Sequence, residues 1–552
     1  MTTISRYIIS VFCICSVCGY TQNDSYKYTV SKQVFNAIVS AYGSARNAPE
    51  FEVKPKNYPG KKQILMYYPG EQPKIIMDED VYDLCVEMGP DSINALAALL
   101  GHELAHHYEK HNWCSSFAFL LDDKSELKQK LSKIAKETKS ANEAEADDVG
   151  GFYGYVAGFS TYDITAKLLD KIYACYKLPN SIKGYPTKDE RKQIALTSLK
   201  KIEQYKAVFD AGETMYCLKE YEISSACFEY LADKFPSREM FGNAGLVKVL
   251  SAMEFMDEKT MPYILPLEID ARTRLKSGAV RGSAISAAEK EIRKNKLLKD
   301  AVSYFDKAIT IESTYCNALI NKACAYILLK NYDMATGIAN EVIANKGKYA
   351  NYDLSKAYSL RGIAQFFKND KEKSQENFEV AQQFAPVSRN NYNLAVIKEL
   401  NKGVFDVVTD LVASYLEEEK TSNFGKEKAI NTDLEKIGSE SASQPNTANA
   451  VEITVPADKE VQISFASHDI YKTLKIKEGK KTYNILITED GYNGKTSQGI
   501  NKGENAEKIK QKYGEPTYTI DELRGKYLVY RKSRIVFLLN RNNRLMKWFI
   551  YY

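Results

Sequence analysis

A period of 34 residues between about residues 205 and 420 constrains the fold of this chain more than any other feature of its sequence. Each unit carries a small residue at positions 8 and 20, an aromatic residue at position 24 and a proline at position 32. Two units show the pattern, with Gly212, Ser224, Phe228 and Pro236 in the first and Gly362, Ser374, Phe378 and Pro386 in the second. Small residues let the two helices of a hairpin touch, and the aromatic ring packs against the next hairpin. The spacing therefore predicts stacked helical hairpins, which form an all-α solenoid.

Partial units lie between the two complete ones. They are marked by Ala301, Phe305 and Ala308 in one unit and by Ala323, Tyr326 and Ala335 in the next. The pattern resembles the tetratricopeptide repeat, and the resemblance implies a solenoid over 205–420 whose concave face suits extended protein segments. Residues 257–297 break the period and contain Pro262 and Pro266, so we expect an insertion there.

The first 19 residues have the pattern of an export signal. Arg6 precedes a run from Tyr7 to Cys18 that is apolar except for two serines, and Gly19 completes an acceptable small-residue cleavage site. This order is that of a signal peptide, and the run is too short to span a bilayer. We therefore expect cleavage near Gly19 and a periplasmic location. The alternatives are a lipid anchor on Cys18 and secretion.

Length and composition set further limits. At 552 residues, the chain is long enough for three to four domains. No stretch approaches the roughly 18 consecutive apolar residues of a membrane-spanning helix, which argues against a polytopic membrane protein. A net charge of +5 is too small to indicate a nucleic-acid partner. Histidine is unevenly distributed, because four of the five lie within residues 102–111.

Residues 102–106 have the pattern HExxH, in which x is any residue. His102, Glu103 and His106 lie in an apolar helix that is predicted from about Ser92 to His111. Residues i and i+4 share one helical face, so both imidazoles are placed to bind one tetrahedral Zn²⁺. Glu103, next to the first histidine, is placed to act as the general base. The string alone is weak, but a buried helix rarely keeps such groups without partners.

Two strands are predicted before this helix, at 63–68 and 73–78, around a turn that begins at Pro69. The second strand includes Ile75-Ile76-Met77 and comes shortly before the histidine helix. We expect it to be the edge of a sheet, where an extended substrate pairs by backbone hydrogen bonds.

A catalytic zinc site needs a third protein ligand, and an acidic pair lies downstream. Glu143 and Asp147 are spaced i and i+4, so they share one helical face. Gly150, Gly154 and Gly158 continue the same spacing. Because glycine in a helix costs about 1 kcal/mol relative to alanine, a packing reason is expected. Close approach to the histidine helix would supply that reason.

The HExxH motif and the downstream motif ExxAD, from Glu143 to Asp147, together resemble the M48 family of zinc metallopeptidases. The resemblance covers roughly residues 30–200 and implies a zincin-like α+β domain, mainly α, at 24–200, with one zinc ion per chain. The absence of membrane helices after the motif argues against the bilayer-embedded branches of the family. The resemblance gives roles to six residues: the zinc ligands His102, His106 and Glu143, the base Glu103, the orienting carboxylate Asp147, and His111 in the place of a family histidine.

Alternatives remain for the neighbouring residues. On a regular helix, His107 and His111 point away from His102, so they form either a second metal pair or packing and hydrogen-bonding contacts. Glu145 and Asp148 are alternatives to Glu143 and Asp147 in a shifted register. Three candidates exist for the group that stabilises the oxyanion: Tyr153, Tyr155 and His107.

The C-terminal part differs in composition. Residues 421–450 predict a linker, because 436–450 carry almost nothing to bury. Residues 451–552 predict a small α+β domain with one helix at about 505–513. Its predicted strands are 451–455, 461–465, 471–476, 483–487, 526–530, 534–539 and 544–551. Residues 470–552 contain 18 Lys and Arg against 8 Asp and Glu. This surplus is either a solvated basic surface or a contact surface for an anionic partner, such as a lipid surface.

The sequence thus predicts a multidomain chain with a layout similar to that of periplasmic proteases that police outer-membrane protein assembly. The expected function is that of an exported zinc metalloendopeptidase in envelope protein quality control. The repeats would recruit protein or peptide substrates and contact envelope assembly proteins. The alternative is a non-catalytic binding or assembly factor that keeps the peptidase fold as a scaffold.

Overall fold

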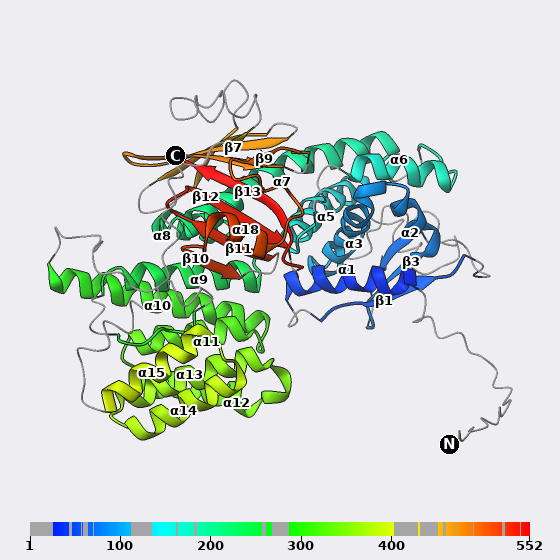
Figure 1. The fold of residues 1–552 in the computed structure, drawn as a ribbon. Coiled ribbons are helices and arrows are strands. Elements are labelled where there is room, and N and C mark those ends of the chain that lie inside the picture. The colour runs from blue at the N-terminus through cyan, green and yellow to red at the C-terminus, as the bar shows by residue number, and fades with distance from the viewer. Residues whose placement is uncertain are drawn as a thin grey trace, which may run out of the picture.

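The computed structural model describes residues 26–43, 47–56, 58, 64–69, 71–111, 135–159, 161, 164–181, 185–256, 261–267, 286–401, 429–430, 451–455, 460–467, 470–489, 491–521, 525–540 and 542–552. These residues are mainly helical, with a separate antiparallel sheet towards the C-terminal end (Figure 1). The predicted signal peptide lies outside them. Within the described part of the chain, no helix is both long and apolar enough to cross a bilayer.

The N-terminal part combines a three-stranded sheet with helices. Its elements are α1 (Tyr26–Tyr42), β1 (Glu50–Lys54), β2 (Leu65–Tyr68), β3 (Lys74–Asp78), α2 (Glu79–Val86), η1 (Gly89–Asp91), α3 (Ser92–Tyr108), α5 (Lys136–Val156), α6 (Thr165–Cys175) and α7 (Lys188–Cys217). The two strands predicted before the histidine helix are confirmed, because β2 and β3 are antiparallel neighbours.

The prediction that the second of these strands is a sheet edge is wrong. The strand order is β1-β3-β2, so β3 is central, with β1 parallel on one side and β2 antiparallel on the other. Ile75, Ile76 and Met77 are all buried. An uninterrupted apolar run of this kind is typical of a strand that is covered on both faces.

From α7 onward the chain forms helical hairpins. Their elements are α8 (Tyr221–Lys234), α9 (Arg238–Met253), α10 (Ala287–Ile311), α11 (Cys316–Leu328), α12 (Tyr332–Ala344), η4 (Lys346–Lys348), α13 (Asn351–Phe367), α14 (Lys371–Phe384) and α15 (Ser388–Asn401). A Cβ added to Gly212 would lie 3.3 Å from the ring of Phe228, and one added to Gly362 would lie 3.0 Å from that of Phe378. In these two pairs, the small residue at position 8 therefore lies against the aromatic ring at position 24 of the same pair.

The boundaries of this region differ from the expected ones. The expected boundary at 200–205 falls inside α7, a continuous helix, so the two parts share one helix. The insertion is shorter than 257–297, because α10 begins at Ala287. A Cβ added to Gly245 of α9 would lie 2.6 Å from the ring of Phe305, so α9 and α10 form one hairpin despite the long connection between them.

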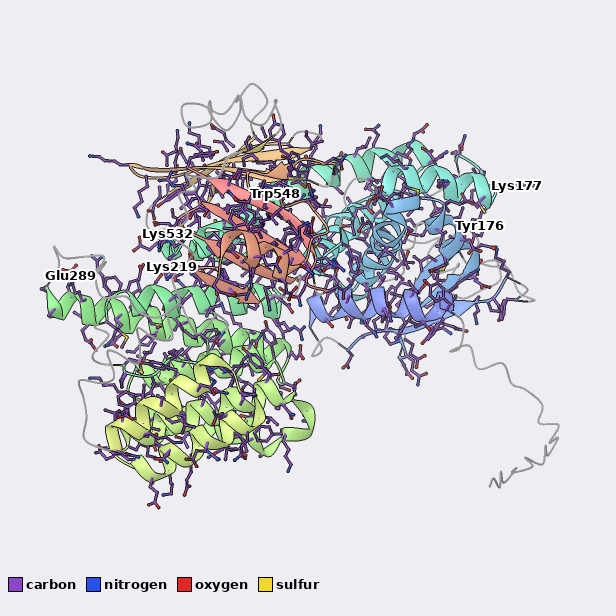
Figure 2. The ribbon with its side chains drawn as sticks, in the orientation of Figure 1. Tyr176, Lys177, Lys219, Glu289, Lys532 and Trp548 are labelled. Carbon is purple, nitrogen blue, oxygen red and sulfur yellow. The ribbon has the colours of Figure 1, made fainter. Side chains whose placement is uncertain are left out.

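The C-terminal sheet has eight strands in the order β10-β11-β12-β13-β8-β7-β6-β5. Its elements are β5 (Val451–Val455), β6 (Val461–Ser467), β7 (Tyr471–Glu478), β8 (Lys481–Thr488), α18 (Ala506–Tyr513), β10 (Tyr518–Asp521), β11 (Gly525–Tyr530), β12 (Ile535–Asn540) and β13 (Leu545–Tyr551). The helix α18 packs Ile509 and Tyr513 on a buried cluster that includes Trp548. Trp548 is labelled in Figure 2. The alternation of the sequence predicted each of these elements except β10.

Buried ion pairs join this sheet to α7. The ammonium group of Lys472 in β7 lies 3.0 Å from the carboxylate of Asp210 in α7, and both side chains are 3% exposed. The hydroxyl of Tyr155, in α5, donates to the same carboxylate. A second, partly exposed pair joins Lys481 of β8 to Glu220, the residue before α8, at 3.1 Å. Part of the basic surplus of the C-terminal region is therefore matched by acidic groups of the helical part.

The predicted linker is described at only two residues. Ala429–Ile430 forms β4, which pairs with β9 (Lys495–Thr496) in an antiparallel arrangement. The rest of 421–450 lies outside the described residues.

Candidate metal centre

Two helices, α3 and α5, place the candidate metal ligands, and their backbones meet at two glycines. A Cβ added to Gly101 would lie 2.7 Å from the carbonyl oxygen of Gly150. A Cβ added to Gly150 would lie 2.7 Å from the backbone nitrogen of His102. The expected packing reason for Gly150 is therefore confirmed. The glycine pattern ends at Gly154, since α5 ends at Val156.

The side chains of His102, His106 and Glu143 converge in a buried group that can hold a metal ion. The two Nε2 atoms are 3.0 Å apart, and oxygens of Glu143 lie 3.4 Å from Nε2 of His102 and 3.6 Å from Nε2 of His106. Ligands about 2.0–2.1 Å from a tetrahedral zinc ion are separated by about 3.3 Å. The donor atoms therefore already have the spacing of three corners of a zinc tetrahedron.

The outer nitrogens of both imidazoles have partners. Nδ1 of His102 lies 2.7 Å from Oδ1 of Asp147, and Nδ1 of His106 lies 2.9 Å from Nδ1 of His111. Nε2 of His111 in turn lies 3.1 Å from Glu145. Carboxylates only accept hydrogen bonds, so in the neutral imidazoles both chains of bonds run outward and the lone pair of each Nε2 faces the centre. This tautomer is the one a metal ligand requires.

His111 reaches His106 because α3 ends before it. The helix ends at Tyr108, and Lys110 takes a left-handed conformation with φ 57°. The backbone N–H of His111 then donates to the carbonyl of His106 at 2.9 Å, which turns the chain back over the helix. The angular argument from a regular helix placed His111 on the far side, and it fails at this turn.

Arg191 belongs to this buried group, and the sequence did not reveal it. Its guanidinium, 4% exposed, lies 3.2 Å from Glu143 and 3.2 Å from Asp147. Arg191 stands in the first turn of α7, behind a capping box formed by Thr187 and Glu190. The capping box fixes where α7 begins, but nothing local shows which helix the arginine faces.

Neighbouring charges determine the ionisation of Glu143 and His102. Burial alone would raise the pKa of Glu143, but Arg191 and His102 hold it well below its ordinary value. Burial would likewise lower the pKa of His102, whereas Asp147 and Glu143 raise it to about 10. The two carboxylates are thus kept ionised inside the protein by a buried cation.

Glu103 occupies a different environment. Its carboxylate, 2% exposed, accepts the backbone N–H of Tyr67 in β2 at 2.7 Å. Burial raises its pKa to about 8, so it is a far stronger base than an exposed glutamate. The edge strand β2 thus fixes the orientation of the group that the motif predicts as the base.

The other candidates have different partners. His107 contacts the hydroxyl of Tyr67 and the carbonyl of Asn47, and it forms no metal pair with His111 in the described structure. Asp148 pairs with Lys201. The hydroxyl of Tyr155 is bonded to Asp210, and that of Tyr153 to the carbonyl of Pro236. The two tyrosines are therefore engaged elsewhere, and Glu145 contacts His111 rather than the converging group.

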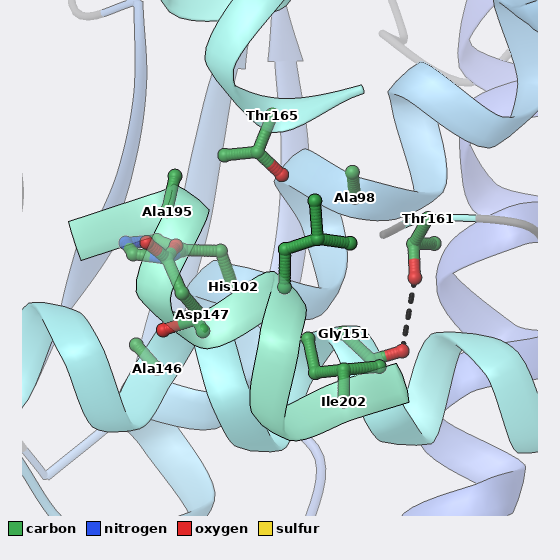
Figure 3. Close-up of a pocket in the computed structure, with 11 residues that line it drawn as sticks. Ala98, His102, Ala146, Asp147, Gly151, Thr161, Thr165, Ala195 and Ile202 are labelled. Atoms are coloured by element: carbon green, nitrogen blue, oxygen red, sulfur yellow. Dashed lines mark hydrogen bonds and ion pairs between the residues drawn. The ribbon is translucent and has the colours of Figure 1, made fainter. Parts of the chain in front are cut away.

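A small hollow lies beside His102 and Asp147, between α3, α5, α6 and α7 (Figure 3). Its walls include the small side chains of Ala98, Ala146 and Ala195. At its far side, the hydroxyl of Thr161 donates to the carbonyl of Gly151 at 2.9 Å, drawn dashed in Figure 3. The hollow borders the outer side of His102, next to the orienting carboxylate.

Comparisons of this chain with protein-family models and with curated proteins found no match.

If the group holds a divalent metal ion such as Zn²⁺, replacing Arg191 by methionine is expected to weaken its binding by about 10- to 100-fold, because the buried carboxylates of Glu143 and Asp147 lose their cation and their fixed positions. A competition titration against a zinc-binding dye measures the change. Lys201→Met is the matched control, since it removes an exposed ion pair between the same two helices. Equal zinc affinities of the two variants would show that Arg191 has no positioning role.

Proposed function

We propose that this chain is an exported zinc endopeptidase, similar to the M48 metallopeptidases, that cleaves envelope proteins. The observation that carries the proposal is the convergence of two Nε2 atoms and a carboxylate from two helices, at the spacing of zinc ligands, beside a buried glutamate. His102, His106 and Glu143 would hold the ion, and the position left open would face the substrate.

The roles of the side chains follow from their contacts. A zinc ion held by these residues would supply polarisation of the scissile carbonyl and a lower pKa for bound water. Glu103 accepts a proton from the attacking water and returns it to the leaving amine. Asp147 and His111 hold the ligand imidazoles in orientation and tautomer, and Arg191 keeps the two carboxylates of α5 in place.

The edge of β2 is the place where we expect a substrate strand to lie. In the described sheet β2 is an outer strand, and the N–H of Tyr67 connects it directly to Glu103. An extended peptide bound along this strand would bring a scissile carbonyl close to the base. Backbone pairing gives little sequence specificity, so selection of substrates is left to the hairpins, which we propose to be a tetratricopeptide array.

The proposal is tested by metal content and proteolysis together. Purified chain is expected to contain one zinc per molecule by atomic emission and to hydrolyse casein. Dialysis against 1,10-phenanthroline is expected to abolish both, and added Zn²⁺ to restore both. Chain that stays metal-free after zinc addition, or that holds zinc without cleaving any protein substrate, would contradict the proposal.

A further inference from the structure

Residues 261–267, Met-Pro-Tyr-Ile-Leu-Pro-Leu, form a segment that is neither helix nor strand and lies against α13, α14 and α15. All its residues except Pro262 are buried. The segment belongs to the connection between α9 and α10, residues 254–286. Other hairpins need only a short connection, such as 218–220 or 329–331. The inserted segment is therefore more than a turn between helices.

Asn393 of α15 binds the backbone of this segment at two points. Its Oδ1 accepts the N–H of Ile264 at 2.8 Å, and its Nδ2 donates to the carbonyl of the same residue at 3.0 Å. Asn393 is fully buried, and its Nδ2 also donates to the hydroxyl of Ser359 in α13, which fixes the amide. Recognition of an N–H and a C=O of one residue requires an extended backbone but no particular side chain.

The neighbouring residues complete the contact. The hydroxyl of Tyr392 donates to the carbonyl of Pro262 at 3.1 Å. The ring of Tyr263 lies between Phe366 of α13 and Phe378 of α14, at centroid distances of 4.9 and 5.1 Å. The two prolines have no N–H to satisfy and keep the backbone extended. These features together are those of a peptide in a binding groove.

We propose that the surface formed by Ser359, Phe366, Phe378, Tyr392 and Asn393 is a docking site for an extended, apolar segment of another polypeptide. Residues 261–267 occupy it as a tethered competitor, because they supply in the same chain what such a ligand would supply from outside. This docking site rests on the proposed recruitment of substrates by the hairpins. Its ligands would be unfolded or extended apolar chains, held mainly through their backbone.

Peptide binding is measured in full-length chain that carries Glu103→Gln, so that hydrolysis does not affect the result. The probe is a fluorescein-labelled peptide with the sequence of residues 261–267, followed by fluorescence anisotropy. Tyr263→Ala removes the aromatic anchor of the tethered segment but leaves the helices intact. The apparent Kd is expected to fall at least 10-fold, because a larger fraction of the sites is open. Ile264→Pro, which removes the N–H that Asn393 accepts, is expected to act in the same direction.

Two controls separate this result from a general loosening. Tyr332→Ala removes a ring that stacks on Phe367 of the same array at 5.4 Å, and it is expected to leave the Kd unchanged. A probe that is N-methylated at its isoleucine is expected to bind the Tyr263→Ala chain at least 10-fold more weakly, because Asn393 loses its donor. No binding of the parent probe to either release variant, with helix content preserved, would overturn the proposal. Equal binding of the two probes would overturn it as well.

Discussion

Replacing Glu103 by glutamine is expected to lower the rate of casein hydrolysis by about 10²–10⁴-fold while one zinc per chain is retained. Glutamine has the same shape and keeps an oxygen that can accept the N–H of Tyr67. It cannot accept a proton from water, so only the acid–base step is removed. Initial rates on casein, together with zinc content by atomic emission on the same samples, measure the two effects separately.

Glu87→Gln is the matched control for that substitution. Glu87 follows α2, its side chain is 60% exposed, and it pairs only at the surface with Lys171. Its loss is expected to leave the rate unchanged. If Glu103→Gln and the unmodified chain cleave casein equally, the hydrolysis comes from a contaminant or another site. The alternative role of a non-catalytic assembly factor would then be favoured.

The residues of the centre that the sequence predicts are those fixed by local geometry. His102 and His106, like Glu143 and Asp147, are spaced so that any helix places them on one face. Whether the two pairs face each other depends on how the two helices pack, which local spacing does not determine. The sequence indicates this packing through Gly150, because glycine destabilises a helix unless a close neighbour requires it.

The contacts that the sequence does not predict come from chain reversals and third partners. His111 reaches His106 only because the chain turns at Lys110, which carries no glycine or proline signal. Arg191 belongs to another helix, and its choice of partners depends on how α7 crosses α5. From sequence alone, a charged residue in a charged segment is predicted to be exposed to solvent.

The same division holds for the fold. In the eight-stranded C-terminal sheet, local apolar patterns mark each strand except β10, so the boundaries of the marked strands agree within a few residues. The central position of β3 depends on β1, a strand from a separate segment, and is therefore invisible to local patterns. The buried pair of Lys472 and Asp210 joins residues 262 positions apart, and each alone looks like a solvated charge.

Replacing Gly150 by alanine is expected to lower the rate of hydrolysis by about 10²-fold and to destabilise the fold by about 1–3 kcal/mol. The added Cβ would lie 2.5 Å from the carbonyl carbon of Gly101 and 2.7 Å from the nitrogen of His102, so backbone must move. Because α3 carries the two imidazoles and α5 the carboxylate, their separation displaces Glu143 from its ligand position. A displacement of about 1 Å is enough for this loss of rate.

Gly151→Ala tests whether crowding of the two backbones is the cause. It adds the same methyl group one residue further along α5, but that Cβ would lie 2.5 Å from Cδ1 of Ile202, the end of a side chain that can rotate away. Both substitutions gain the same helix propensity, about 1 kcal/mol, so the difference between them isolates the contact of α3 with α5. Thermal unfolding, zinc titration and casein hydrolysis are compared for the two variants. Equal values in all three would mean that the glycine contact does not set the distance between the ligand-bearing helices, and the centre would have to be held together from elsewhere.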